Sequence, residues 1–392
     1  MKILHFNQHG ALVGGVEGYI KDVSSALAKA GHTPSLIYFT PHSTEDLLSN
    51  SICMPVVNSA NVTDGFFAQL EDRIRDFKPD IAFVHAVYQP EIIRWLQAHL
   101  PVVAYVHGPY LICPGSALYW RASRRVCNRP VSLACLMFAQ TERCCFGRNP
   151  IRHLQQLLKV REFLNLYQDM PIMVGSHYMQ AAMISNGLTA EQISILSPIM
   201  FEKVPPFSHS ESTTILFAGR VVPEKGLHLL LLALATVKEP WNLVVAGDGD
   251  DLPHCQKLAG DLGIADRVDF IGWQKPAAMA RLYGQCAMVA VPSLWPEPYG
   301  RIGPEAFYYG RPVVAFDVGG VSDWLQHNRT GFLIAPGDVQ ALSEALAQLL
   351  NSPTLRERLS EHAHALASRL WNANTHVMSL LTRFERVLNI TK

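Results

Sequence analysis

Short apolar runs alternate with longer stretches of helical periodicity along almost the whole chain. The runs occupy residues 3–6, 36–39, 81–84, 102–106, 172–174, 193–196, 215–218, 243–246, 268–271, 288–291 and 313–316. Continuous apolar strands between amphipathic helices are typical of parallel sheets that are covered on both faces. The alternation therefore predicts an α/β fold built from doubly wound, Rossmann-like sheets.

The length of the chain indicates more than one domain, because 392 residues exceed what one hydrophobic core usually holds. We expect an N-terminal domain over 1–200, a proline- and serine-rich linker over 201–212 and a C-terminal domain over 213–370. The helical pattern of 371–392 is expected to pack back on the N-terminal domain. Two such domains facing one another would border a deep cleft with the carboxyl ends of their strands, where open α/β sheets bind ligands.

Composition argues against several classes of protein. The 33 basic residues equal the 33 acidic ones, so no net charge favours a nucleic-acid partner. No apolar run reaches the roughly 18 residues of a membrane span. The first ten residues, MKILHFNQHG, lack the apolar core of a secretion signal. Eight cysteines without such a signal are most simply reduced thiols, so we expect a cytoplasmic protein.

The stretch WPEPYGRIGPE, residues 295–305, places two acids around a segment that resists regular structure. Pro296 and Pro298 exclude Glu297 from a helix, whereas Pro304 suits the first turn of one. We expect Glu297 on a loop at a strand's carboxyl end and Glu305 at a helix start. Eight helical steps would separate them by roughly 12 Å. The alternative is that Glu305 complements the helix dipole and Glu297 is solvated.

Two basic residues follow the strand at 215–218. Gly219 ends this strand, and Arg220 and Lys225 lie on the loop before the next helix. Arginine binds phosphate oxygens in a bidentate manner and lysine acts as a point charge. The loop therefore predicts a diphosphate site, with an ordinary charged surface loop as the alternative.

Glycines at the start of the first predicted helix form a second candidate anion site. Gly14 and Gly15 would present free helix amides there. Their spacing is not the dinucleotide fingerprint, and the later AGDGDDL segment puts aspartates where a pyrophosphate would lie. A hydride-transferring dehydrogenase is therefore poorly supported. Asp250 or Asp251 fits a helix cap instead.

Two histidines end predicted strands of the first domain. His107 closes the strand VVAYV, and His85 holds an equivalent position after IAFV. A histidine at a strand end that borders a cleft can contact a substrate. A purely structural role is the alternative for both.

Taken together, these motifs resemble the retaining glycosyltransferase family 4, whose members have the GT-B fold of two facing Rossmann-like domains. The resemblance covers nearly the whole chain. Its strongest element is a signature of two glutamates separated by seven residues, here Glu297 and Glu305. The family's phosphate motif is matched by Gly219 and Arg220 with Glu224, Lys225 and Gly226, and its N-terminal diglycine by Gly14 and Gly15.

The resemblance implies a role for each matched residue. Arg220 and Lys225 would neutralise the diphosphate of the donor, and Glu305 would bind its ribose. Glu297 and the backbone amides of Tyr299, Gly300 and Arg301 would hold the transferred sugar, with His107 near its anomeric centre. Gly219 belongs to the phosphate loop, Gly15 would touch the phosphates or the acceptor, and Gly272 and Trp273 would contact the base.

The implied activity is the transfer of a hexose from a nucleotide-diphosphate sugar, UDP-glucose or a related UDP-sugar, to a glycan or a lipid-linked saccharide. No metal is expected, because the basic pair stabilises the leaving diphosphate. The two acids of a retaining glycosidase lie only about 5 Å apart, so we interpret these glutamates as binding groups. The acceptor would attack on the leaving-group side. A nucleotide-sugar epimerase and a non-catalytic nucleotide-sugar-binding protein are the alternatives.

An insertion-like region over about 110–152 departs from a generic member of this family, although its cysteines after a strand that ends in histidine also resemble a subset of the family. It carries five cysteines, Cys113, Cys127, Cys135, Cys144 and Cys145, but no C-x-x-C pair. We expect reduced thiols that pack a loop, with zinc or a disulfide as the alternative.

Residues 121–161 contain nine basic side chains and one acid, Glu142. The apolar segment LACLMFAQ lies among them. This pattern suggests peripheral docking to anionic lipid headgroups or to a lipid diphosphate-linked acceptor at the inner membrane face. A solvated basic surface is the alternative.

Overall fold

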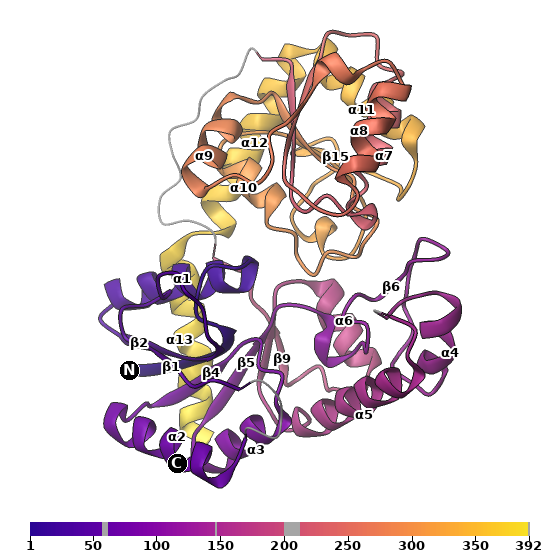
Figure 1. Ribbon diagram of the computed structural model, residues 1–392. Helices are drawn as coiled ribbons and strands as arrows, with labels where there is room; N and C mark the ends of the chain where they lie inside the picture. Colours follow the sequence, from indigo (N-terminus) through magenta and orange to yellow (C-terminus); the bar gives the residue numbers. More distant parts are fainter. Residues whose placement is uncertain (57–61, 146, 200–211, 391–392) are drawn as a thin grey trace. The chain divides into compact units, whose positions relative to one another are not determined.

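The computed structural model describes residues 1–56, 62–145, 147–199 and 212–390, and it divides the chain into two compact units (Figure 1). Unit 1 comprises Met1–Ala117, Asn128–Glu202 and Trp371–Lys392, and unit 2 comprises Leu118–Cys127 and Lys203–Leu370. The linker that we expect over 201–212 lies outside the described residues except for Ser212.

Unit 1 is built on a seven-stranded sheet in the described residues, and all its strand pairs are parallel. The strand order is β3 (Ser51–Cys53), β2 (Thr33–Thr40), β1 (Lys2–His9), β4 (Ile81–Val84), β5 (Val102–Val106), β8 (Ile172–Val174) and β9 (Ile193–Ile195). The central strands are buried on both faces, as their unbroken apolar sequences predict.

Helices cover the sheet of unit 1. They are α1 (Gly15–Lys29), α2 (Asp64–Phe77), α3 (Pro90–His99), α4 (Ala134–Thr141), α5 (Pro150–Leu166), α6 (His177–Ser185) and α13 (Ala373–Ile390). The 3-10 turn η2 (Pro109–Leu111) follows β5. One core cluster joins α1, the central strands and α13, so the last helix of the chain is part of the hydrophobic core of unit 1.

Unit 2 repeats this architecture with a six-stranded parallel sheet among its described residues. Its order is β12 (Val268–Phe270), β11 (Asn242–Ala246), β10 (Thr214–Ala218), β13 (Met288–Val291), β14 (Val313–Phe316) and β15 (Gly331–Ile334). Its helices are α7 (Leu227–Leu234), α8 (Leu252–Asp261), α9 (Pro276–Gln285), α10 (Ile302–Tyr308), α11 (Val339–Asn351) and α12 (Pro353–Leu370), with 3-10 turns η3 (Pro223–Lys225), η4 (Ala265–Arg267) and η5 (Val321–Asp323).

A short antiparallel hairpin departs from the expected division of the chain. Strands β6 (Tyr119–Trp120) and β7 (Arg125–Val126) belong to the segment Leu118–Cys127, which clusters with unit 2. The flanking parts of the 110–152 region, with η2, α4 and the start of α5, cluster with unit 1. The insertion is therefore shared between the two units.

Two residues, Trp371 and Asn372, separate α12 from α13. Trp371 is 3% exposed there, and the Oδ1 atom of Asn372 accepts hydrogen bonds from the backbone N–H groups of Asn374 (3.0 Å) and Thr375 (3.2 Å). This side chain caps the start of α13. The interruption also marks the return of the chain from unit 2 to unit 1.

Candidate functional site

The loops that follow β10 and β13, two neighbouring strands of unit 2, are tied together by their backbones. The carbonyl oxygen of Glu224 accepts a hydrogen bond from Leu294 N at 2.8 Å. Gly226 has φ of +72°, and a Cβ atom there would lie 1.9 Å from Pro292 O. This position therefore requires glycine. The close approach fixes Lys225 beside the loop that follows β13.

Lys225 forms an ion pair with Glu297 across these two loops. The Nζ atom of Lys225 also lies 4.9 Å from the ring centroid of Trp295, a cation–π contact. Glu297 is only 6% exposed, and its carbonyl oxygen accepts a hydrogen bond from Gly320 N at 2.7 Å. The structure thus confirms that Glu297 lies on a loop at the carboxyl end of a strand, and it adds the ion pair with Lys225.

Arg220 extends from the same sheet edge. The preceding Gly219 has φ of +133°, and its N–H donates to Ala246 O at 3.1 Å. A Cβ atom on Gly247 would lie 1.8 Å from Gly219 O, so the loops after β10 and β11 pack backbone against backbone. Arg220 itself is exposed. The loop therefore presents a guanidinium group near the edge where the Lys225–Glu297 pair lies.

Glu305 lies in the first turn of α10, as its position behind Pro304 predicts. Its Oε2 atom accepts a hydrogen bond from the Tyr283 hydroxyl at 3.0 Å, and its Oε1 atom lies 3.4 Å from Arg301 Nε. Burial, reinforced by the neighbouring carboxylate, raises the pKa of Tyr283 well above its usual range, so the phenol remains a donor. Glu305 is held from two sides.

The backbone between the two glutamates is also fixed in place. Gly300 has φ of +83°, which favours glycine. The indole Nε1 of Trp324 donates to Tyr299 O at 2.7 Å. Trp324 is 0% exposed, so the backbone of this segment is held from the interior of the unit.

Gly272 and Trp273 stand apart from these residues, after β12 and thus two strands away from β10. Gly272 has φ of +66°, and Trp273 is 69% exposed. An aromatic ring so exposed at a carboxyl edge is a surface on which a flat ligand can stack.

Sequence reasoning missed two of the supporting residues in unit 2. Arg121, on the β6–β7 hairpin, forms an ion pair with Glu224, with 2.6 Å between Arg121 Nε and Glu224 Oε1. Tyr283 on α9 supports Glu305. Arg121 precedes Glu224 by 103 residues, so no local pattern reveals this pair. In the sequence, Arg121 is recognisable only as the first residue of the basic stretch of 121–161.

In unit 1, the loop between β1 and α1 is organised by a carboxylate that the sequence analysis also missed. Glu17 is 4% exposed, and its two oxygens accept hydrogen bonds from Asn7 Nδ2 (3.0 Å) and Gly14 N (2.9 Å). The Oδ1 atom of Asn7 in turn accepts from Ala86 N at 3.1 Å. Glu17 thereby caps α1 and leaves Gly15, its exposed first residue, at the carboxyl edge of the sheet.

The two candidate histidines are hydrogen-bonded to each other rather than competing for one role. His85 Nδ1 and His107 Nε2 are 3.1 Å apart, at the ends of the adjacent strands β4 and β5. The rings of Tyr19 and Tyr105 lie against His107, with centroid distances of 5.2 Å and 4.5 Å. His107 is half-buried, whereas His85 is fully buried.

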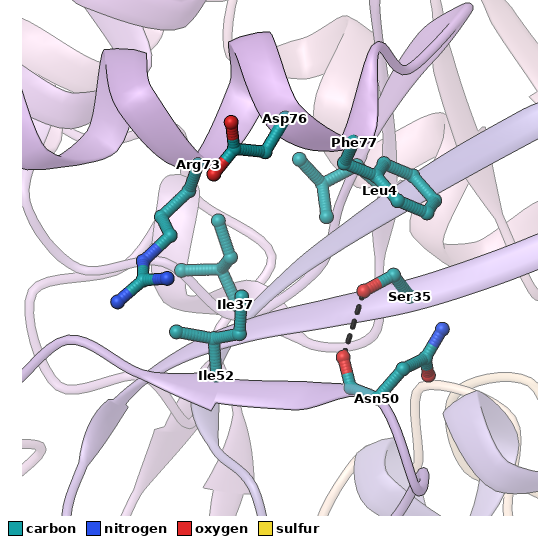
Figure 2. A pocket seen from close by; sticks show the side chains of 8 residues that line it. All are labelled: Leu4, Ser35, Ile37, Asn50, Ile52, Arg73, Asp76 and Phe77. Atoms are coloured by element: carbon teal, nitrogen blue, oxygen red, sulfur yellow. Dashed lines mark hydrogen bonds between the residues drawn. The ribbon is translucent and has the colours of Figure 1, made fainter.

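A cavity of about 280 Å³ in unit 1 lies away from all of these residues. Figure 2 shows it between the strands β1 to β3 and the end of α2. Its lining is Leu4, Ser35, Ile37, Asn50, Ile52, Arg73, Asp76 and Phe77, and the dashed line marks the 2.8 Å hydrogen bond from Ser35 Oγ to Asn50 O. Leu4 and Ser35 pair in the amino half of β1 and β2, so this cavity does not belong to the carboxyl edge.

Three side chains of types that can bind a metal ion lie close together outside the cysteine-containing region of 110–152. Among the described residues, Asp251, His254 and Cys255 bring their ligand atoms within 4.8 Å of one another. Asp251 Oδ1 lies 3.1 Å from His254 Nδ1, and Cys255 Sγ lies 3.5 Å from Asp251 Oδ2. These distances fit hydrogen bonds around the first turn of α8, where Asp251 occupies the predicted cap position.

The region of 121–161 combines basic and apolar exposed side chains, and its helices α4 and α5 lie side by side (Figure 1). On α5, Ile151, Leu154 and Leu158 are 67%, 41% and 55% exposed, and their spacing of three and four residues places them on one face. Arg148 and Arg152 are exposed near Ile151 in the sequence. Of the helices in the described residues, none has the length and apolarity needed to cross a bilayer.

Models of two known protein families match this chain, one mainly in unit 2 and the other mainly in unit 1. The model of "Glycosyl transferases group 1" matches residues 201–365. The model of "Glycosyltransferase Family 4" matches residues 13–135. The first match contains Arg220, Lys225, Glu297 and Glu305, and the second contains Gly15 and His107.

Curated relatives match over part of their length. An alpha-D-kanosaminyltransferase of Streptomyces kanamyceticus is 32% identical over 155 residues, which make up 39% of this chain and 40% of that protein. A D-inositol 3-phosphate glycosyltransferase of Corynebacterium urealyticum is 34% identical over 169 residues, 41% of this chain and 40% of that protein. The matched part thus spans about two fifths of each relative.

Solved structures match over nearly the whole chain. HepE of Anabaena in complex with UDP-glucose has a TM-score of 0.74 at 20% identity, over 98% of this chain and 100% of that one. Sucrose-phosphate synthase of Thermosynechococcus elongatus has a TM-score of 0.75 at 17% identity, over 99% of both chains. At such identities the likeness establishes the fold, and it agrees with the two Rossmann-like units described above.

Proposed function

The chain belongs to the group 1, family 4 glycosyltransferases and has their GT-B fold, and we propose that it transfers a hexose from a nucleotide-diphosphate sugar. UDP-glucose or a related UDP-sugar is the proposed donor, and a hydroxyl of a glycan or of a lipid-linked saccharide is the proposed acceptor. The observation that carries the proposal is the partly buried Lys225–Glu297 pair, which lies on the same sheet edge as the exposed Arg220. The UDP and UDP-glucose complexes of HepE support the choice of donor.

The diphosphate is assigned to the basic side chains at the carboxyl end of β10. Arg220 is exposed and has the planar fork that binds two phosphate oxygens. Lys225 adds a point charge, and its contacts with Glu297 and Trp295 hold its ammonium group in one place. Charge that is already oriented before the bond breaks stabilises a leaving diphosphate efficiently. The proposed reaction therefore needs no metal ion.

The sugar and the ribose are assigned to the two glutamates. Glu297 would accept hydrogen bonds from sugar hydroxyls, and the N–H groups of Tyr299, Gly300 and Arg301 would donate to them. Glu305, held by Tyr283 and Arg301, would bind the ribose hydroxyls. Trp273 and Gly272 would contact the base. Because Glu297 and Glu305 each have a cationic partner, binding roles suit them better than the acid and nucleophile roles of a retaining glycosidase.

We further propose that the reaction retains the anomeric configuration. The acceptor hydroxyl would attack from the side on which the diphosphate leaves, and a departing phosphate oxygen would take its proton. The C–O bond to the diphosphate breaks as the C–O bond to the acceptor forms, so the exchange balances without another reactant. His107 and Gly15 of unit 1 are assigned to the sugar and to the phosphates or acceptor, respectively.

Transfer by the variant Glu297→Gln tests this assignment. The substitution keeps the shape of the side chain and removes the charge that pairs with Lys225, so we expect at least a hundredfold loss of turnover, the scale of losing one oriented charged group. Sugar transfer from radiolabelled UDP-glucose is the measurement, with Glu361→Gln, an exposed glutamate on α12, as the matched control. Turnover by Glu297→Gln equal to that of the control would refute the role of Glu297.

Product analysis separates the alternatives. A non-catalytic nucleotide-sugar-binding protein would bind the donor without slow hydrolysis when no acceptor is present. An epimerase would convert the donor sugar without consuming an acceptor.

The exposed face of α5 is proposed to contact an anionic membrane that carries the acceptor. Ile151, Leu154 and Leu158 would enter the headgroup region, and Arg148 and Arg152 would meet lipid phosphates. We expect co-flotation with vesicles that contain phosphatidylglycerol and its loss in Arg148→Glu/Arg152→Glu. The matched control, Arg358→Glu/Arg369→Glu, changes exposed residues of α12. Equal flotation of both double variants, or flotation with neutral vesicles at high salt, contradicts membrane docking.

A further inference from the structure

Three histidines and a serine form a continuous hydrogen-bonded chain inside unit 1. Ser24 Oγ, on α1, lies 3.4 Å from His5 Nε2, on β1. His5 Nδ1 lies 2.9 Å from His85 Nε2, at the end of β4. His85 Nδ1 lies 3.1 Å from His107 Nε2, at the end of β5. The chain thus runs from the interior of the unit to the carboxyl edge of its sheet.

The interior of this chain is closed to water. His5 and His85 are both 0% exposed, and the ring of Phe83 lies 5.3 Å and 4.4 Å from them between centroids. Burial lowers the pKa of His5 to about 3 and that of His85 well below its usual range, the latter with the neighbouring His5 and His107 as smaller causes. Near neutral pH both imidazoles are therefore uncharged.

An uncharged imidazole has one N–H group and one lone pair, which gives the chain a direction. If His85 donates from Nδ1 to His107, its Nε2 must accept from His5 Nδ1. If His107 donates from Nε2 to His85, then His85 must donate onward to His5. The Ser24 hydroxyl fits either order, because it can donate or accept. The tautomer of His107 is thereby coupled to those of His85 and His5.

We propose that His85 is a positioning residue whose hydrogen bond from ring to ring holds His107 in place and couples the tautomer of His107 to its own. The consequence for catalysis rests on the proposed function, in which His107 contacts the transferred sugar. A ring with a fixed tautomer has one defined donor nitrogen and one defined acceptor nitrogen. If the His107 ring could rotate or exchange tautomers, its donor and acceptor nitrogens would not be fixed. The bound sugar would then be oriented less well.

The two ring nitrogens of His85 can be tested separately by amide substitutions. In His85→Asn the amide group occupies the place of Nδ1, so the hydrogen bond to His107 can persist while the one to His5 is lost. In His85→Gln the amide reaches the place of Nε2, so the bond to His5 can persist while the one to His107 is lost. Each of the two variants therefore removes one of the two hydrogen bonds of His85 and can keep the other.

Nitrogen NMR of protein labelled with ¹⁵N-histidine is the primary measurement, because ring ¹⁵N shifts distinguish protonated from bare nitrogens. The His107 signals are assigned by their loss in His107→Gln. We expect one tautomer of His107 in the wild type and in His85→Asn, and a mixture in His85→Gln. We expect kcat to fall by about tenfold in His85→Gln, the effect of one net hydrogen bond, with KM for the donor changing less. His85→Asn should remain within about threefold of the wild type.

Two results would overturn the proposal. One is an unchanged His107 tautomer and unchanged kcat in a folded His85→Gln. The other needs no variant: wild-type signals in which the facing nitrogens of His85 and His107 are both protonated or both bare. Failure of the proposed function looks different. If no nucleotide sugar is turned over by the wild type but the His107 tautomer still responds to His85→Gln, the positioning role stands and the transferase role fails.

Discussion

Lys225 and Glu297 form an ion pair in which the carboxylate is nearly buried and the lysine is partly exposed, so removing the cation has a cost that can be measured. Lys225→Met leaves the Glu297 carboxylate, 6% exposed, without its cation. We expect the free energy of unfolding of unit 2 to fall by about 2–3 kcal/mol. Urea unfolding followed by a signal from unit 2 is the measurement.

Two comparison variants make this prediction specific. Lys257→Met breaks a pair with Asp261 whose side chains are 73% and 59% exposed, and it should cost less than about 1 kcal/mol. Lys225→Met/Glu297→Gln removes the unpaired charge and should be more stable than Lys225→Met alone. Equal stabilities of Lys225→Met and Lys257→Met would show that the Lys225–Glu297 pair contributes no more than a surface contact.

The sequence predicted the local positions of single candidate residues but not their pairings. Proline and glycine chemistry placed Glu297 on a loop and Glu305 at a helix start, and the structure confirms both positions. The contact between Lys225 and Glu297 spans 72 residues of sequence, and that between Arg121 and Glu224 spans 103. Such contacts depend on which strands become neighbours in the sheet, which residue types alone do not specify.

Among the elements, the strands were the most predictable. Each of the eleven apolar runs became a strand, because a sheet covered on both faces requires an unbroken apolar sequence. The edge strands β3 and β15 were missed. β3 is only three residues long and partly exposed, so its sequence has no clear apolar run. β15 begins at Gly331, a residue type that is uncommon in strands. Glycine is required there because φ is +156° and a Cβ atom would lie 1.9 Å from Val313 O.

Helix α13 is the element whose docking depends on a buried histidine. His376 is 5% exposed, its Nε2 lies 3.1 Å from the Tyr19 hydroxyl and its Nδ1 lies 3.0 Å from Ser197 O. Burial is the main cause that lowers the pKa of His376 to about 4, although the bond to Ser197 opposes the shift. A protonated His376 ring would carry a charge in a buried site that water does not solvate. Lowering the pH should therefore weaken the packing of α13 on unit 1.

The sign of this effect follows from proton binding. Between pH 6.5 and about 4 the unfolded chain binds a proton at His376 and the folded chain does not, so stability is complete above pH 6.5 and falls as the pH is lowered. We expect unit 1 to lose about 1 kcal/mol per pH unit from this group. His376→Asn, which can still donate to Ser197 O, should reduce the slope of unfolding free energy against pH. The exposed control His362→Asn should leave it unchanged. Identical slopes for both variants would contradict the role of His376.

For the whole molecule, the order of its motifs along the chain was sufficient to predict two Rossmann-like units and the family. Their internal boundaries were less predictable. The segment Leu118–Cys127 clusters with unit 2 although its sequence neighbours belong to unit 1. The hairpin is short, and the Arg121–Glu224 ion pair that connects it to unit 2 has no sequence signature.

In the proposed function, the carboxyl edge of unit 2 binds a nucleotide-diphosphate sugar through Arg220 and its neighbours. Thermal unfolding with UDP-, GDP- and ADP-glucose tests it most directly, because a ligand that binds the native state at a hundred times its Kd adds about 2.7 kcal/mol of stability. We predict that one of these donors raises the Tm of the wild type and of Arg281→Ala, an exposed control on α9, but not that of Arg220→Ala. No rise with any donor in the wild type, or an equal rise in Arg220→Ala, would contradict the account.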